Sequence, residues 1–264
     1  MRAPESPEPF SLIGGPLHQL GRRLGLVRGT NTVRLGLVLG AGLWLVVVVL
    51  AVAGGITDRL FDMSVVAGHA RLLLVIPLFF VCVSWIAPRM TAFIAAIAGT
   101  GVVPAAAKPA LDAEVARTRG RVKAWWPEAV CLLTAIGSEV TGWRLQIYGE
   151  TAGPDSGRMA LAFRVYFHPG LTLFRFLLFR AAWNLGVWTW FLWRVSRLDL
   201  HLMPSHPDRA GGLGSLEGVH ERLTPIVAAL SILVSASVAE SISMGTLAVS
   251  GVYPTLAMLL LGEA

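Results

Sequence analysis

The sequence predicts an all-α, multi-pass helical membrane protein with about five transmembrane helices and a partial sixth segment. Of its 264 residues, 55% are hydrophobic and 14% are charged, whereas an ordinary soluble domain has about 25% charged residues. The run 35–56 carries no charge over 22 positions, which is long enough to cross a bilayer at about 1.5 Å per residue. These observations exclude a soluble globular enzyme, a disordered chain and a nucleic-acid-binding domain, and the length fits one domain.

Residues 1–34 form a basic N-terminal segment ahead of the helical transmembrane domain, 35–264. The first apolar run, 35–56, ends near an Ala-Val-Ala sequence that resembles a signal-peptide cleavage site. Because a signal peptide rarely has 34 residues before its apolar core, we expect an uncleaved first span.

Four further apolar runs, separated by polar loops, are predicted to span the membrane: 72–87, 126–143, 172–194 and 224–246. Pro77 is expected to kink the first of these near its start. The span 126–143 is the weakest prediction because it contains Glu128 and Glu139. The Ala- and Gly-rich run 92–107 is predicted to be an interfacial or buried helix, because these residues add little transfer energy.

The last apolar run, 252–262, is half the length of a span. It is expected to be a short re-entrant helix or part of a truncated final segment. With five spans and a cytoplasmic N-terminus, the inner loops hold 15 of the 22 basic residues. Basic residues gather on the cytoplasmic side, so this orientation is favoured. If 126–143 does not span, 14 of the 22 lie inside, so charge barely separates the two topologies.

Composition points to a bacterial inner membrane. Only Lys108 and Lys123 are lysines among the 22 basic residues, and the excess of arginine, with abundant Ala, Gly and Val, indicates a GC-rich bacterial genome. Cys82 and Cys131 both lie in apolar runs, without the spacing of a zinc site or a disulfide framework.

An intramembrane polar cluster is predicted from three ionisable residues. Arg180 lies near the centre of the span 172–194, and a bare arginine there costs about 2.5–3.5 kcal/mol, so a partner is expected. Counting from the span centres puts Glu139 and Glu240 at a similar depth. Asn184 lies one helical turn after Arg180 on the same face. Small residues every four positions on 224–246 favour tight packing against 172–194.

Two functions remain open for this cluster. The leading interpretation is a polar site or ion pathway in a transport or channel-like component. The alternative is an ion pair that fixes helix register, in a non-catalytic scaffold or sensor subunit that binds a partner through the cytoplasmic HPDRAGGLG loop. A membrane enzyme would need a nucleophile or a metal set, and the residues offer no convincing one. No cofactor is therefore expected, and the oligomeric state is open. Trp190 and Trp193 fit an interfacial belt.

The polar loop 195–222 carries a dense motif. Leu198, Leu200 and Leu202 alternate with polar residues, which favours an extended stretch. Glycines permit positive φ and exposed backbone N–H groups, so the loop is expected to hold an anion, a lipid headgroup or a protein partner. The motif residues are His206, Pro207, Asp208, Arg209, Gly211, Gly212 and Gly214. The spacing of its histidines matches no standard metal-ligand set, so no metal is predicted.

The run 174–214, FRFLLFRAAWNLGVWTWFLWRVSRLDLHLMPSHPDRAGGLG, resembles the signature of an uncharacterised bacterial multi-pass inner-membrane protein family. In that family a Trp/Arg-rich helix is followed by an HPDRAGGLG loop. HARLLLVIPL, 69–78, is similar to the beginning of its second span, and the two motifs cover about a fifth of the chain. The resemblance implies a multi-pass membrane protein with a further span and a cytoplasmic tail, and it implies no activity.

Overall fold

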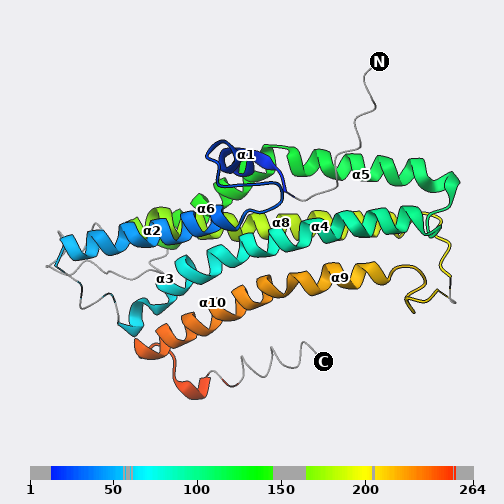
Figure 1. The fold of residues 1–264 in the computed structure, drawn as a ribbon. Coiled ribbons are helices and arrows are strands. Elements are labelled where there is room, and N and C mark those ends of the chain that lie inside the picture. Colours follow the sequence, from blue (N-terminus) through cyan, green and yellow to red (C-terminus); the bar gives the residue numbers. More distant parts are fainter. Residues whose placement is uncertain are drawn as a thin grey trace.

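The protein is an elongated bundle of helices (Figure 1). The structure, a computed structural model, describes residues 13–144, 165–203 and 206–253, apart from residues 56, 58, 59, 61 and 252. The described residues contain no strand. Most helices run along the long axis of the bundle, whereas α1 (Gly15–Arg23) lies across its side, halfway along (Figure 1).

The longitudinal helices follow one another up and down the bundle. Their bounds are α2 Val33–Ala53, α3 Val66–Ala70, α4 Ile76–Gly99, α5 Lys108–Lys123, α6 Trp126–Arg144, α8 Leu171–Val195, α9 Glu217–His220 and α10 Thr224–Ser243. Along the bundle, α6 packs on α8, α2 on α4, and α5 on α8, while α10 packs mainly on α3 and α4. The prediction that 224–246 packs tightly on 172–194 is therefore wrong.

Within the described residues, three helical stretches are long and apolar enough to cross a membrane: α2, Val66–Gly99 and Gly214–Ser243. The five predicted apolar spans all contain helices at close to the expected residues. However, α6 and α8 fall short as candidate spans, because buried charges and, in α8, four tryptophans lower their mean hydropathy. A count of five spans is therefore not confirmed. The run 252–262 lies largely outside the described residues.

The second span is much longer than the sequence predicted. The helix continues from Val66 to Gly99, through a π-helical segment at Arg71–Val75 and past Pro88. The prediction of a separate helix over 92–107 was wrong, because residues 92–99 continue α4. Pro77 causes no break, since it stands at the start of α4, directly after the wider π-helical turn.

Apolar side chains form two cores at different levels of the bundle. The bundle core joins α2, α6, α10, the beginning of α4 and the first half of α8, and the extension core joins the end of α4, α5, the end of α8 and α9. Trp183 of α8 contacts both cores. The deepest side chains of the bundle core include Val75, Ile76 and Ala135, and those of the extension core include Met90, Ile97, Phe191 and Val219.

Two glycines let α2 approach the second helical stretch closely. Gly36 packs against the ring of Phe80, and Gly40 packs against the backbone of Leu72. A Cβ at either position would overlap its neighbour. This close approach also places Thr32, just before α2, against α4: its hydroxyl donates to the carbonyl of Phe80 at 3.0 Å, and its N–H donates to Ser84 Oγ at 2.9 Å.

Gly40→Val is expected to destabilise the protein by about 1–3 kcal/mol, because the added side chain meets a backbone carbonyl that cannot rotate away. Gly42→Val is the matched control, since nothing lies within 4 Å of a Cβ at that position. Thermal denaturation of both variants in detergent micelles measures the difference. Equal melting temperatures for the two variants would contradict the close helix contact.

Candidate functional site

A buried ion pair joins α8, α6 and the segment before α1. The Nε of Arg180 donates to Glu128 Oε1 at 2.8 Å, and Arg180 Nη2 donates to the carbonyl of Gly14 at 2.9 Å. The other carboxylate oxygen of Glu128 accepts the N–H of Leu17 at 2.9 Å. The side chains of Arg180 and Glu128 are only 11% and 12% exposed. Each charge therefore has a partner, and the pair holds α1 on the bundle.

The local sequence allows this docking. A Cβ on Gly14 would lie 2.8 Å from the carbonyl oxygen of Val122, and a Cβ on Gly15 would overlap the carboxylate of Glu128. Gly15 also has φ +86, a conformation that favours glycine. Pro16 then begins α1 with a ring already suited to the first helical turn. The Gly-Gly-Pro sequence thus lets the chain pass directly over the ion pair.

His18 on α1 adds no positive charge at neutral pH. Burial lowers the pKa of His18, and the nearby Arg180 and Arg22 guanidinium groups lower it further. Its Nδ1 is buried and has no hydrogen-bond partner in the described part of the chain. The contact between α1 and the bundle is therefore centred on a single ion pair, with a neutral imidazole beside it.

The predicted cluster of Arg180, Glu139 and Glu240 is not formed. Arg180 pairs with Glu128, in the first turn of α6, whereas Glu139 lies about 16 Å further along that helix. Glu139 instead accepts from Thr172 Oγ1 and contacts His168 Nδ1 at 2.6 Å, which ties the end of α6 to the beginning of α8. Depths counted from the span centres did not give the relative heights of α6 and α8, and these heights decide which carboxylate meets Arg180.

Glu240 lies elsewhere, half-buried on α10. It interacts electrostatically with Arg71, in the π-helical segment before α4. The guanidinium of Arg71 also donates to Ser237 Oγ at 3.2 Å. The three predicted charges thus belong to three separate interhelical contacts.

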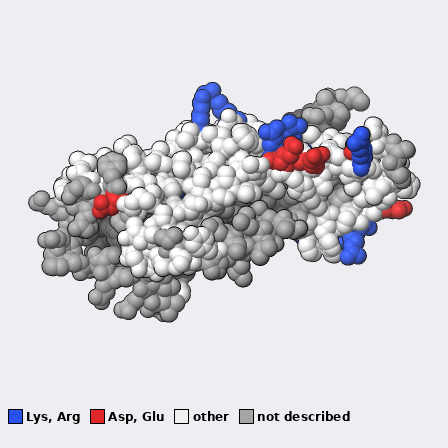
Figure 2. All heavy atoms as spheres, turned by 90° about the horizontal axis from the view of Figure 1, so that it is seen from below, with Lys and Arg blue, Asp and Glu red and all other residues white. Residues whose placement is uncertain are grey.

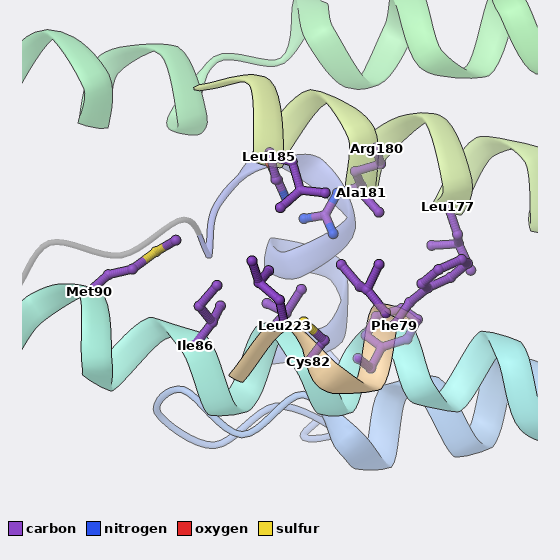
Figure 3. A pocket seen from close by; sticks show the side chains of 13 residues that line it. Phe79, Cys82, Ile86, Met90, Leu177, Arg180, Ala181, Leu185 and Leu223 are labelled. Carbon is purple, nitrogen blue, oxygen red and sulfur yellow. The ribbon is translucent and has the colours of Figure 1, made fainter. Parts of the chain in front are cut away.

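A small cavity of about 40 Å³ lies beside Arg180, between α8 and α4 (Figure 3). Arg180 and Asn184 both line it, as their shared helix face predicts. The rest of the lining is mainly apolar and comes from both cores, including Phe79, Ile86 and Met90. A cavity of this size accommodates a few water molecules at most.

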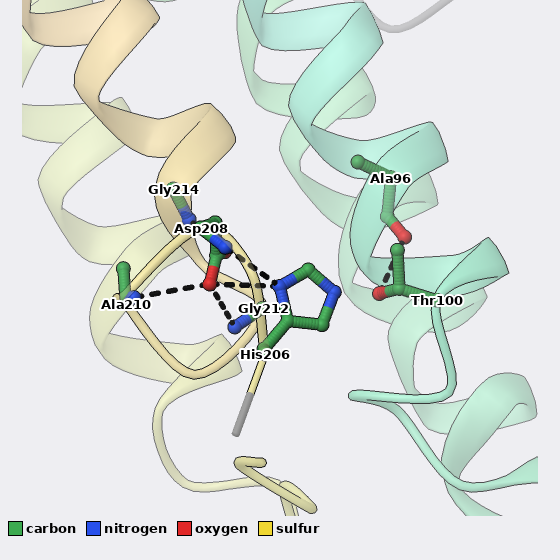
Figure 4. A network of polar contacts seen from close by, with 7 residues as sticks. All are labelled: Ala96, Thr100, His206, Asp208, Ala210, Gly212 and Gly214. Atoms are coloured by element: carbon green, nitrogen blue, oxygen red, sulfur yellow. Dashed lines mark hydrogen bonds and ion pairs between the residues drawn. The ribbon is translucent and has the colours of Figure 1, made fainter. Parts of the chain in front are cut away.

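The HPDRAGGLG loop is organised around Asp208 (Figure 4). Its Oδ1 accepts the N–H groups of Ala210 at 3.0 Å and Gly212 at 3.1 Å, and its Oδ2 accepts the N–H of Gly214 at 2.8 Å. The ring of His206 lies 2.7 Å from the same carboxylate. The sequence suggested that the backbone amides of this loop are free to bind an external anion. In the structure, the Asp208 side chain accepts hydrogen bonds from these three amides, so they are not free to do so.

The loop is also anchored to the end of α4. The N–H of His201 donates to the carbonyl of Val102 at 2.8 Å, and the N–H of Met203 donates to the carbonyl of Gly211 at 3.2 Å. Gly212 is buried against Val102. Gly211 and Gly212 have positive φ, as the glycine motif predicted, whereas Gly214 does not. Residues 199–203 have no regular secondary structure. The loop is thus held in one conformation.

Asp208 makes the loop sensitive to acid. Burial opposes ionisation, but the N–H groups of Gly214, Ala210 and Gly212, together with the His206 ring, hold the pKa of Asp208 well below its usual range. A lowered folded-state pKa stabilises the loop fully above the unfolded value of about 4, and the stabilisation is lost as pH falls towards the folded-state value.

We therefore expect the amides of Ala210, Gly212 and Gly214 to lose protection from hydrogen exchange as pH falls from about 6 to 3, after correction for intrinsic rates. The control is Asp208→Asn, whose protection should be lower at pH 6 and nearly independent of pH. Protection in the native protein that stays constant across this range would contradict the role of the carboxylate.

A basic and aromatic surface covers the extension core. Arg121 lies over the ring of Trp190 at 5.6 Å, and Arg197 lies over the ring of Trp193 at 5.0 Å. Beneath them, Glu114 on α5 accepts from Arg194 of α8 at 2.6 Å. The hydrogen bond from Arg194, with the charges of nearby arginines, lowers the pKa of Glu114 despite its partial burial. Sequence reasoning missed this contact, as it missed Glu128.

Comparisons with protein-family models, with curated proteins and with solved structures find no match to this chain.

Proposed function

We propose that this chain is a non-catalytic scaffold or sensor subunit of the bacterial inner membrane. Five helices cross the bilayer with the N-terminus in the cytoplasm, and the extension core projects from the cytoplasmic side. The HPDRAGGLG loop, at the end of that extension, binds a protein partner. The observation that carries the proposal is the exposed, rigid loop, in which Asp208 fixes the backbone and Arg209 is presented to solvent.

Helix lengths support the division into a membrane part and an extension. The 21 residues of α2 span about 31 Å, close to the 30 Å of a bilayer hydrocarbon core. The 34 residues of Val66–Gly99 span about 51 Å, so roughly 20 Å of this stretch must lie beyond the hydrocarbon. The beginning of α2 lies level with Ser84 of α4, and the residues of α4 that follow Ser84 contribute to the extension core.

The pattern of α6 supports its inclusion as a span despite its two carboxylates. The side chains of Glu128 and Glu139 are only 12% and 10% exposed, and both point towards partners on neighbouring elements. Five aliphatic side chains of α6 are exposed instead: Val130, Leu132, Leu133, Ile136 and Val140. Polar groups inside and apolar groups outside is the arrangement of a helix that faces lipid. Figure 2 shows another face of the molecule, on which most of the charged side chains that can be seen lie towards the α5 and α9 end.

Arg209 supports a binding role for the loop. It is the only non-glycine residue with positive φ in the described part of the chain, at φ +54. That conformation costs an ordinary residue about 1–2 kcal/mol, and glycine would adopt it without cost. An exposed arginine at a strained backbone position supports a role for this side chain in contact with a partner. The exposed Leu202 and Met203 lie on the same loop.

Site-specific photo-crosslinking in cells tests the proposal. A crosslinker at Met203 should trap one dominant protein, whereas one at Val46, on the apolar face of α2, should trap lipid.

The binding of the purified partner to variants of Arg209 is the second test. The partner should bind the protein at least tenfold more weakly after Arg209→Gly, which removes both the side chain and its backbone strain. Arg209→Lys should recover part of the affinity. Equal binding by all three forms would refute a docking role for the loop.

Transport is the second candidate function, because Arg180 and Asn184 line one cavity between α8 and α4. Proton and ion flux into liposomes would be compared between the native protein, Arg180→Gln and Glu240→Gln. Flux that is abolished by Arg180→Gln in a protein that remains folded would favour a pathway beside this cavity. Loss of stability without any flux in the native protein would favour the scaffold.

A further inference from the structure

The N-terminal region of the described chain presents a group of arginines that no carboxylate neutralises. Residues 13–57 contain no Asp or Glu. Four arginines in this region are exposed, and none forms an ion pair within the described residues: Arg22, Arg23, Arg28 and Arg34. The arginines of the extension differ, because Glu114 pairs with Arg117 and Arg194. We call the four exposed residues the arginine collar.

Two contacts fix the height of the collar on the bundle. The ion pair between Arg180 and Glu128 holds the beginning of α1 at the first turn of α6. Thr32 holds the beginning of α2 against Ser84 of α4. The collar therefore lies where both α2 and α6 begin, and α1 crosses the bundle at this height (Figure 1).

Exposed aromatic and apolar side chains accompany the collar. Trp125 and Trp126 at the beginning of α6 are 70% and 46% exposed, and Trp85, next to Ser84, is 49% exposed. Leu20 on α1 and Leu24 directly after it are exposed beside Arg22 and Arg23. Tryptophans at one height, with a short helix that carries both basic and apolar exposed side chains, are typical of the membrane–water interface.

We infer that the arginine collar binds the headgroups of anionic phospholipids in the cytoplasmic leaflet. The inference rests on the proposed placement in the membrane. A guanidinium donates two parallel hydrogen bonds to phosphate oxygens, and no carboxylate among the described residues pairs with the collar. Leu20, Leu24 and the tryptophans would enter the acyl boundary beside the headgroups. The bound lipids would hold α1 flat against the bundle, over the ion pair.

Electron paramagnetic resonance of spin-labelled lipids tests the inference in reconstituted membranes. The quantity measured is the association constant of labelled phosphatidylglycerol relative to labelled phosphatidylcholine. The native protein should prefer phosphatidylglycerol, and the triple variant R22Q/R23Q/R28Q should lose most of this preference, by up to about fivefold per arginine at low salt. High salt should reduce the preference of the native protein as well.

The matched control removes three exposed arginines from the extension, R117Q/R121Q/R197Q, and should keep the preference. Circular dichroism establishes that both triple variants are folded. An unchanged preference in the collar variant would overturn the inference, as would an equal loss in both variants, which would indicate an effect of net charge. The lipid preference is measured without a protein partner. Its outcome therefore does not depend on whether a crosslinker at Met203 traps a protein.

Discussion

Glu128→Gln is expected to destabilise the protein by about 3–5 kcal/mol, the usual cost of leaving one member of a buried ion pair without its counter-charge. The guanidinium of Arg180 is only 11% exposed, so water cannot replace the lost carboxylate fully. The substitution keeps the size of the side chain and one acceptor oxygen. The loss therefore reports the charge and not a cavity. Unfolding by SDS titration in mixed micelles measures it.

Two further variants isolate the ion pair from other effects. Glu217→Gln removes an exposed carboxylate from α9, and its effect should stay within about 0.5 kcal/mol. The double variant E128L/R180M replaces both charges by apolar groups and should be much more stable than Glu128→Gln, because no buried charge remains unpaired. A double variant as unstable as the single one would show that the contacts to Gly14 and Leu17 dominate instead.

The positions of the helices could be predicted from the sequence because apolar runs and helix-forming segments are local properties. The predicted runs 126–143, 172–194 and 224–246 correspond to α6, α8 and α10 within a few residues. Length was harder to predict. The helix Val66–Gly99 continues past Pro88 because tertiary packing in the extension core stabilises its end. A hydropathy argument treats the bilayer as the only apolar surroundings, so it ends the helix too early.

The partner of Arg180 could not be predicted because it depends on the relative heights of α6 and α8. A shift of a few residues in either helix moves a side chain by several ångströms, enough to exchange one carboxylate for another. Glu128 was visible in the sequence, but it was counted only as a charge that weakens the predicted span 126–143, and not as a partner of Arg180. The carbonyl of Gly14, which completes the contact, leaves no sequence signal other than the neighbouring glycine and proline.

The loop shows the opposite balance between sequence and structure. Its glycines correctly indicated positive φ at Gly211 and Gly212, because that property is local. The sequence analysis did not predict that the carboxylate bound by the loop amides belongs to Asp208 of the same loop. An Asp two residues before the first of its three amide donors can fold back on them, so the same motif that suits a bound anion also suits an internal carboxylate. The proposed binding role of the loop therefore rests on the side chains that it exposes, and not on its backbone amides.

Gly212→Ala is expected to destabilise the loop by about 2–5 kcal/mol, because two costs add at one position. A φ of +99 strains any residue with a Cβ by about 1–3 kcal/mol. The new methyl would also overlap Val102 Cγ2, and Val102 is fully buried and stiff about χ1. Hydrogen exchange of the amides in 206–214, together with thermal denaturation, would show the loop separating from the end of α4.

Gly211→Ala is the matched control for backbone strain alone. Gly211 also has positive φ, at +67, but the nearest atom to an added Cβ is 3.4 Å away, an ordinary contact. This variant should cost about 1–2 kcal/mol and leave the loop docked. If both variants cost the same, the contact between Gly212 and Val102 contributes nothing, and the loop is held by Asp208 alone. Both variants keep Arg209. If Gly212→Ala weakens binding of the proposed partner and Gly211→Ala does not, then packing of the loop against the end of α4 is needed to position Arg209.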